Sequence, residues 1–200
     1  VLAGLTLAQI RNLPLEQSKN ARKVADLFEV SGEDTENIHF KNSTSQLDYI
    51  GYKMTHGTIT IEGNAGDFLG ANMQNGSIIC QGNTGDRAGD LMRRGLILID
   101  GNTGDYCASR MIAGTIGVYG KVGQYVGFAM KRGTVLLNTH PLLHETLQDC
   151  GAHTLPFLAL LYQSFSSLAS KFSTLKTQRV QRFAGDLACS GHGEILVLLK

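Results

Sequence analysis

A 19-residue repeat fills the middle of the chain and limits what it can fold into more than any other feature. Four consecutive rows of this length begin at Gly57, Gly76, Gly95 and Gly114. A degenerate row precedes them at 38–56, and a fifth start at Gly133 keeps only its first part. Such a period is typical of solenoids, in which one repeat cannot bury its apolar side alone and neighbouring repeats must stack.

Apolar residues recur at fixed positions of the repeat. Position three holds Phe40, Ile59, Ile78, Ile97, Ile116 and Val135, and position five holds Ile61, Cys80, Ile99, Val118 and Leu137. Position thirteen holds Ile50, Leu69, Ala88, Cys107 and Val126, and position seventeen holds all five methionines, from Met54 to Met130. Because positions three and five alternate, we expect a strand there with these side chains pointing into a core. Cys80 and Cys107 are therefore expected in the core.

Glycine and proline are distributed as a stacked β-coil requires. Seventeen of the 24 glycines lie between Gly57 and Gly133, and no proline lies between Pro14 and Pro141. A proline would remove a hydrogen bond from the ladder between coils. The motif Gly-Asn-x-Gly-Asp occurs at 63–67, 82–86 and 101–105 and is interpreted as a corner followed by a second short strand. The sequence predicts an all-β-dominated parallel β-helix with 19-residue rungs stacked about 4.8 Å apart.

The polar columns are weighed against metal and catalytic sites. The stacked Asn64, Asn83 and Asn102 are expected to bond from rung to rung, and the stacked Asp48, Asp67, Asp86 and Asp105 to cap turn amides, with a metal ladder as the alternative. His140 and His144 have helical i, i+4 spacing but are too few for a zinc site. No Ser/His/Asp or Cys/His set can be assigned, so we assign no catalytic, cofactor-binding or metal residue.

Three domains are expected along the chain. Residues 1–37 are interpreted as an N-terminal cap, with a capping box at Thr6–Gln9 and a strand at Ala25–Val30 that leads into the 38–138 repeat. Residues 139–200 are expected to form a C-terminal cap, with a helix that starts near Pro141, an amphipathic helix at Leu155–Phe172 and a closing β segment from Arg182 to Leu199. The amphipathic helix is expected to cover the outward side chains of the first strands, namely Ile79, Leu96, Leu98 and Leu136.

Two surface groups are candidates for contact with other molecules. Position twelve holds Tyr49, Phe68, Arg87, Tyr106 and Tyr125. Alternation points this column outward, which suits a protein interface, unless the ends of the chain cover it. A basic cluster consists of Arg93, Arg94, Arg110, Lys131 and Arg132. It could form a ridge that meets an acidic partner or an anionic substrate arm, or it could simply be solvated.

Composition narrows the remaining classes. The formal net charge is +1, whereas a general nucleic-acid or anionic-membrane binder usually carries a larger basic excess. The sequence contains no run of 18 apolar residues, so no membrane span is predicted. The four cysteines are far apart, which favours reduced thiols. We therefore expect a cytoplasmic protein with neither nucleic acid nor membrane as its partner.

The rows from Gly57 to Arg132, with their Gly-Asn-x-Gly-Asp corners and methionine column, resemble the GxGxG-repeat superfamily. That superfamily includes the C-terminal domain of glutamate synthase and the C subunit of formylmethanofuran dehydrogenase. The tail Arg182-Phe-Ala-Gly-Asp-Leu-Ala-Cys-Ser-Gly-His-Gly-Glu-Ile-Leu-Val197 resembles the bacterial branch of the second family, the C subunit of the formyltransferase/hydrolase complex.

The resemblance implies a right-handed, single-stranded β-helix that serves as a structural, non-catalytic subunit. Such a complex moves a formyl group from formyl-tetrahydromethanopterin to a methanofuran-type carrier and hydrolyses the product to formate during formaldehyde oxidation. Other subunits would hold the active sites and carriers, so this chain would bind no cofactor and its partners would be those subunits. The alternatives are the C subunit of an archaeal molybdenum or tungsten formylmethanofuran dehydrogenase, a glutamate-synthase-like spacer domain, and a stand-alone β-helix acyltransferase. The 19-residue period argues against the acyltransferase, whose repeats are multiples of six.

Overall fold

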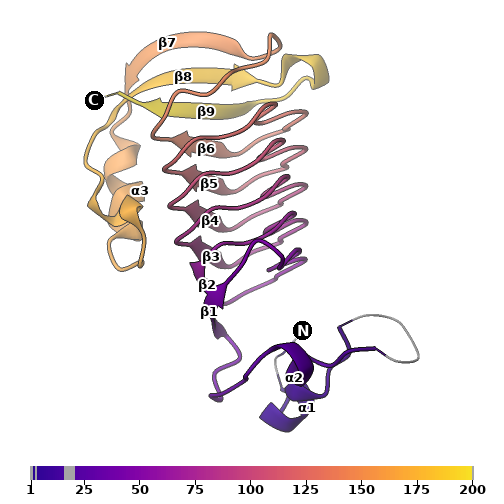
Figure 1. Ribbon diagram of the computed structural model, residues 1–200. Helices are drawn as coiled ribbons and strands as arrows, with labels where there is room; N and C mark the ends of the chain where they lie inside the picture. The colour runs from indigo at the N-terminus through magenta and orange to yellow at the C-terminus, as the bar shows by residue number, and fades with distance from the viewer. Residues whose placement is uncertain (1, 3, 16–20, 200) are drawn as a thin grey trace. The chain divides into compact units, whose positions relative to one another are not determined.

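The computed structural model describes residues 2, 4–15 and 21–199, and it divides into two compact units, Val1–Ile38 and His39–Lys200 (Figure 1). The first unit contains two short helices, α1 (Leu7–Arg11) and α2 (Val24–Leu27). The predicted capping box is confirmed, because the Thr6 hydroxyl accepts a hydrogen bond from the Gln9 amide and the Gln9 side chain accepts one from the Thr6 amide.

The strand predicted at Ala25–Val30 is wrong, because α2 occupies its first half. The Asp26 carboxylate accepts a hydrogen bond from the Lys23 amide and so closes the first turn of the helix. Among the described residues, no strand of the sheet includes Ala25–Val30.

The second unit is a β-solenoid. Its strands are β1 (Asn37–Ser43), β2 (Thr58–Gly63), β3 (Ser77–Cys80), β4 (Leu96–Ile99), β5 (Thr115–Val118), β6 (Thr134–Leu137), β7 (Gln148–Thr154), β8 (Arg179–Gly185) and β9 (Gly193–Leu198). They form one sheet in the order β1-β2-β3-β4-β5-β6-β9-β8-β7. Figure 1 shows the first six strands stacked one above the other, each followed by a loop that returns to the next.

The predicted rung length is confirmed by the strand register. Ile59 pairs with Ile78, Ile78 with Ile97, and Ile97 with Ile116, so each residue pairs with the same position of the next repeat. The side chains of positions three, five, thirteen and seventeen are buried from β2 to β6, as expected. Phe40 and Met54, in the first rung, are only half-buried. Cys80 and Cys107 lie in this core, and burial raises the pKa of their thiols to about 11 and about 12.

The second side of each coil is not a strand, which corrects the expectation of two β-like sides. Positions twelve, fourteen and sixteen there adopt the left-handed conformation, as in Phe68 (φ 59°), Gly70 (φ 64°) and Asn72 (φ 56°). The backbone amides of these positions therefore point alternately toward the following and the preceding rung. The amides of Phe68 and Asn72 donate to carbonyls of the following rung, and the amide of Gly70 donates to the preceding rung. The ladder is thus complete without extended backbone.

The end of the stack is closed by an antiparallel sheet. β9 continues the parallel ladder beside β6, and β8 and then β7 add to it antiparallel. The closing β segment from Arg182 to Leu199 is thereby confirmed. The helix expected from Pro141 is absent, because the described residues 141–144 have no regular structure and the chain proceeds to β7.

One carboxylate completes hydrogen bonding above the last full turn. The Ala129 amide, at position sixteen, has no following rung and donates instead to the Asp186 carboxylate at 3.0 Å. The same carboxylate accepts the Ala188 amide at 2.9 Å. Burial opposes ionisation of Asp186, but hydrogen bonds from Thr146, Ala129 and Ala188, with His144 nearby, outweigh it and lower the pKa of this carboxyl below 3.8.

A helix covers the outer face of the strands, as predicted, but it is shorter than the expected Leu155–Phe172. α3 spans Phe157–Phe165, and the 3-10 turn η1 (Lys171–Thr174) follows it. Their buried side chains Leu158, Phe165 and Phe172 pack in one cluster with Leu98, Leu136 and Leu196. Serines interrupt the apolar pattern after Phe165, where the chain turns to insert Phe172. No helix among the described residues is long and apolar enough to cross a membrane.

Candidate interaction surface

The position-twelve column is held outward by the backbone of its turn. Tyr49, Phe68, Arg87, Tyr106 and Tyr125 all have φ of 58° or 59°. The backbone amide of each of the first four, Tyr49, Phe68, Arg87 and Tyr106, donates to the carbonyl of position eleven in the next rung. This repeated conformation places one large side chain per rung on the same edge of the solenoid. The outward orientation predicted for the column is therefore observed.

The column forms two ring stacks. Tyr49 stacks on Phe68 with ring centroids 4.7 Å apart, and Tyr106 stacks on Tyr125 at 5.0 Å. The Arg87 guanidinium lies over the Tyr106 ring at 4.6 Å from its centroid. The exposed fractions of Tyr49 and Tyr125 are 51% and 42%. The three residues between them, Phe68, Arg87 and Tyr106, are half-buried. A column of stacked rings that is partly open to solvent is typical of protein interfaces.

Two further aromatic side chains, missed at the sequence level, widen the surface. Tyr52 packs edge-on against Tyr49 at 5.7 Å, and Phe128 packs edge-on against Tyr106 at 5.8 Å. Both are at position fifteen, and their exposed fractions are 45% and 44%. In the intervening rungs the same position holds Ala71, Asp90 and Ser109, all buried. The available sequence signal was a large aromatic residue in the first and last rungs at position fifteen, where the other rungs have small side chains or Asp90. We call these seven residues the aromatic edge: Tyr49, Tyr52, Phe68, Arg87, Tyr106, Tyr125 and Phe128.

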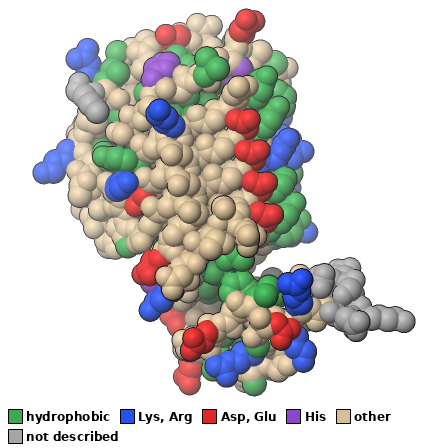
Figure 2. Space-filling view, in the orientation of Figure 1, with side chains coloured by type: hydrophobic (Ala, Val, Ile, Leu, Met, Phe, Trp, Pro, Cys, Tyr) green, Lys and Arg blue, Asp and Glu red, His purple; other side chains and the backbone are tan. Residues whose placement is uncertain are grey.

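A column of aspartates runs beside the aromatic edge. The side chains of Asp48, Asp67, Asp86 and Asp105 each accept the backbone amide of the same position in the next rung, at 2.7–2.8 Å. The expected capping role is confirmed. Figure 2 shows the acidic side chains as a line next to hydrophobic ones. Only one oxygen of each carboxylate is used in this ladder, so the charge remains available at the surface.

The asparagine column bonds in the same way. The side-chain carbonyls of Asn64, Asn83 and Asn102 each accept the amide of the next rung at 2.8 Å. Among the described residues no three His, Cys, Asp or Glu side chains are grouped as metal ligands.

The basic cluster divides into engaged and exposed side chains. Arg110 forms an ion pair with the buried Asp90, whose Oδ1 also accepts a hydrogen bond from Ser109 at 2.6 Å. The Lys131 ammonium donates to the Cys189 carbonyl in the cap at 2.9 Å. Arg93, Arg94 and Arg132 are exposed. Two of the five cations therefore stabilise the chain itself, and three remain for external contacts.

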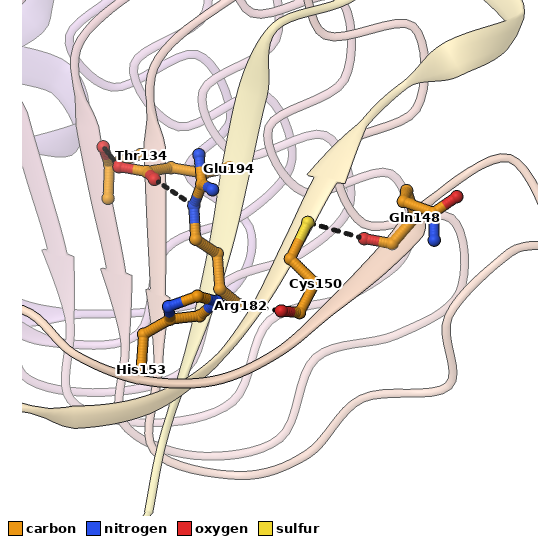
Figure 3. A network of polar contacts seen from close by, with 6 residues as sticks. All are labelled: Thr134, Gln148, Cys150, His153, Arg182 and Glu194. Carbon is orange, nitrogen blue, oxygen red and sulfur yellow. Dashed lines mark hydrogen bonds and ion pairs between the residues drawn. The ribbon is translucent and has the colours of Figure 1, made fainter.

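A second polar group lies on the outer face of the closing sheet (Figure 3). Glu194 accepts hydrogen bonds from Thr134 and from Arg182, both at 3.0 Å, and so joins β6, β9 and β8. On β7, the His153 ring lies 2.8 Å from the Cys150 carbonyl, and the Cys150 thiol donates to the Gln148 carbonyl. These contacts are internal to the sheet and make no nucleophile–base pair.

Two curated proteins match a part of this sequence. No family model matches the chain. Over 57 residues it is 47% identical to the C subunit of tungsten-containing formylmethanofuran dehydrogenase 2 of Methanocaldococcus jannaschii, a match that covers 27% of this chain and 21% of that protein. Over 65 residues it is 32% identical to the C subunit of the formyltransferase/hydrolase complex Fhc of Methylorubrum extorquens, which covers 32% of this chain and 24% of that protein. These matches thus span about a fifth to a quarter of the curated relatives.

The structural similarity extends over the whole chain. A chain in the X-ray crystal structure of the formyltransferase/hydrolase complex (FhcABCD) from Methylorubrum extorquens, solved with methylofuran, superposes with a TM-score of 0.75. The match has 29% sequence identity and covers 100% of this chain and 92% of that one. The chain is thus similar in sequence to the C subunits of a formylmethanofuran dehydrogenase and of a formyltransferase/hydrolase complex, and similar in fold to a chain of the FhcABCD complex.

Proposed function

We propose that this chain is the structural, non-catalytic C subunit of a formyltransferase/hydrolase complex. The complex would transfer a formyl group from formyl-tetrahydromethanopterin to a methanofuran-type carrier and release formate, as a step in formaldehyde oxidation. The observation that carries this proposal is the full-length superposition on a chain of such a complex. The match of 47% identity to an archaeal dehydrogenase subunit covers only 27% of the chain, so it carries less weight than the full-length superposition.

The side chains available support a scaffold. The repeated hydrogen-bonding scheme of the rungs uses the Asp and Asn columns to hold the backbone, which leaves them as structural rather than reacting groups. Within the described residues there is no cluster of metal ligands. We infer that formyl transfer and hydrolysis belong to partner subunits, that this chain holds no carrier or cofactor, and that the complex lies in the cytoplasm.

The aromatic edge would face a partner subunit. Stacked rings lose little side-chain freedom on binding, because their neighbours in the column already hold them. The exposed Arg93, Arg94 and Arg132 would contribute charge-assisted contacts at the rim of an interface.

The test is reconstitution with the other subunits of the complex. The tagged chain, co-expressed with them, should co-purify as a stoichiometric complex that converts the formylated carrier to formate. The chain alone should show no hydrolysis above the rate in buffer. Turnover by the purified single chain would refute the non-catalytic role, and failure of the wild-type chain to co-purify would refute its place in the complex.

A further inference from the structure

The described residues of the N-terminal unit, 2, 4–15 and 21–38, form no hydrophobic core of their own. None of its described residues is buried, in contrast to the core of the solenoid unit. Both of its helices are without a buried side chain. Its apolar side chains are half-buried or exposed, and Leu15 and Leu27 have exposed fractions of 44% and 54%.

Polar contacts define the shape of this unit. The Arg11 guanidinium donates to the Val30 carbonyl at 2.7 Å, and the Lys23 ammonium donates to the Asn12 side chain at 3.1 Å. Backbone hydrogen bonds join Leu15 to Arg22 and Val24 to Leu13. Exposed hydrogen bonds of this kind contribute little net stability, because water competes for the same groups.

A unit of this size needs another source of stability. Chains below about 40 residues usually require a disulfide, a metal or association with another polypeptide. The segment contains no cysteine, since the four cysteines are Cys80, Cys107, Cys150 and Cys189. Its described residues include no group of potential metal ligands. Neither a disulfide nor a metal cluster is thus available within its described residues, which favours association with another surface.

The chemistry of the segment specifies its partner. Five acidic residues lie between Val24 and Phe40, where there is no Lys or Arg: Asp26, Glu29, Glu33, Asp34 and Glu36. The apolar Val24, Leu27, Phe28 and Val30 lie among them, and residues 25–30 line an open hollow together with Arg11. An apolar segment bordered by carboxylates is complementary to an apolar surface bordered by Lys and Arg. The structural match to a chain of the FhcABCD complex covers the whole of this chain, so it includes this unit.

We propose that residues 1–38 form a docking arm that packs against another subunit of the complex, with Leu27 and its neighbours in an apolar hollow whose rim is basic. In the assembly the arm would acquire the core that its described residues do not form by themselves. The inference rests on the proposed function, since it takes the occupant to be a subunit of that complex.

The test compares two leucines of equal exposure in the full-length chain. Leu27→Asp should weaken assembly with the partner subunits about tenfold or more, because the burial of a leucine side chain is replaced by that of a charge. Leu187→Asp, in the cap, is the matched control, since Leu187 is 55% exposed against 54% for Leu27. Both variants should melt as the wild type does when alone. Glu29→Lys should also weaken assembly, and the exposed Glu145→Lys should not.

Hydrogen exchange gives an independent measurement. Amides of residues 24–30 should exchange at least about tenfold more slowly in the complex than in the isolated chain. If the Leu27→Asp variant assembles with the partner subunits as tightly as the wild type does, the docking arm is overturned and the proposed function stays intact. If the wild type instead forms a homodimer that Leu27→Asp dissociates, the occupant is a second copy and the proposal is wrong. A wild type that binds no subunit overturns the proposed function, and the arm as stated falls with it.

Discussion

Asp186 takes the place of a missing rung. In the turns below it, position-sixteen amides such as those of Asn72 and Leu91 donate to carbonyls of the next coil. Above Ala129 there is no next coil, and a carboxylate with an exposed fraction of 2% accepts the bond. A single side chain therefore ends a ladder that backbone groups maintain elsewhere.

Replacing Asp186 with alanine should lower the free energy of unfolding by about 1–3 kcal/mol at neutral pH, since the amides of Ala129 and Ala188 would lose a charged acceptor. Chemical denaturation of the isolated chain measures this change. Because the folded-state pKa of Asp186 lies below 3.8, its contribution is present above pH 3.8 and is lost as the pH falls below it. The difference between wild type and variant should therefore narrow in acid. Glu145→Ala, at an exposed position, is the control, and a difference between wild type and the Asp186 variant that does not change with pH would contradict the assignment.

At the scale of the element, the outer face of the strands has a hollow made by one glycine. Gly117 of β5 is aligned with Leu98 and Leu136, which pack under α3 and η1. A Cβ at Gly117 would lie 2.8 Å from the Phe172 ring and 2.9 Å from Leu98. The missing side chain is what allows Phe172 to insert.

Gly117→Leu should displace the segment that carries Phe172 and cost about 1–3 kcal/mol through overpacking. Limited proteolysis should then cut between residues 165 and 178 while the solenoid remains intact. Thr60→Leu is the matched control, because Thr60 has the same position in β2 but lies outside this cluster. Equal resistance of both variants to protease would show that the hollow is not required.

The sequence predicted the strands and failed on the second side of the coil for a physical reason. Strand register follows from apolar residues one repeat apart, so Ile78 and Ile97 are enough to align β3 with β4. On the second side, inward and outward side chains also alternate. This alternation is the same whether the backbone is extended or every second residue is in the left-handed conformation. Period two cannot distinguish these conformations. Glycine at position fourteen, as in Gly70 and Gly89, was the available signal.

Segments outside the repeat offered less information. The Leu155–Phe172 pattern predicted a docked helix over Leu96, Leu98 and Leu136, but not the break after Phe165. Ile79, also expected under the helix, is not part of this cluster. β7 went undetected because it is mostly polar and exposed, so no apolar alternation marks it. Of the candidate interface, the outward column could be predicted because it repeats, whereas Tyr52 and Phe128 stand at the two ends of a column that is otherwise small. The pairing of Arg110 with Asp90 depends on a buried carboxylate that no pattern indicated.

At the scale of the whole molecule, the aromatic edge is the surface best suited to assembly. Tyr106→Glu combined with Tyr125→Glu should weaken co-purification with partner subunits about tenfold or more, as expected when interface-core aromatics are lost. The fold should survive, because both side chains point outward from turns that other residue types also occupy. Quantitative pull-down and thermal melting measure the two effects.

Two comparisons make this test specific. Tyr106→Ser with Tyr125→Ser removes the rings without adding charge beside the aspartate column. Gln74→Glu with Asn75→Glu adds the same two charges at exposed positions elsewhere on the coil. Assembly that tolerates both tyrosine double variants would exclude the aromatic edge as an interface.

The constant offset of one repeat between paired strands has a consequence for how such a subunit can vary. Removing or adding one whole repeat would leave every remaining residue on its original face and change the separation of the two ends of the solenoid by about 4.8 Å. A change of any other length would turn the methionine and isoleucine columns toward water. The solenoid can therefore lengthen or shorten only in steps of one coil. The number of coils would set the distance between subunits bound at its two ends.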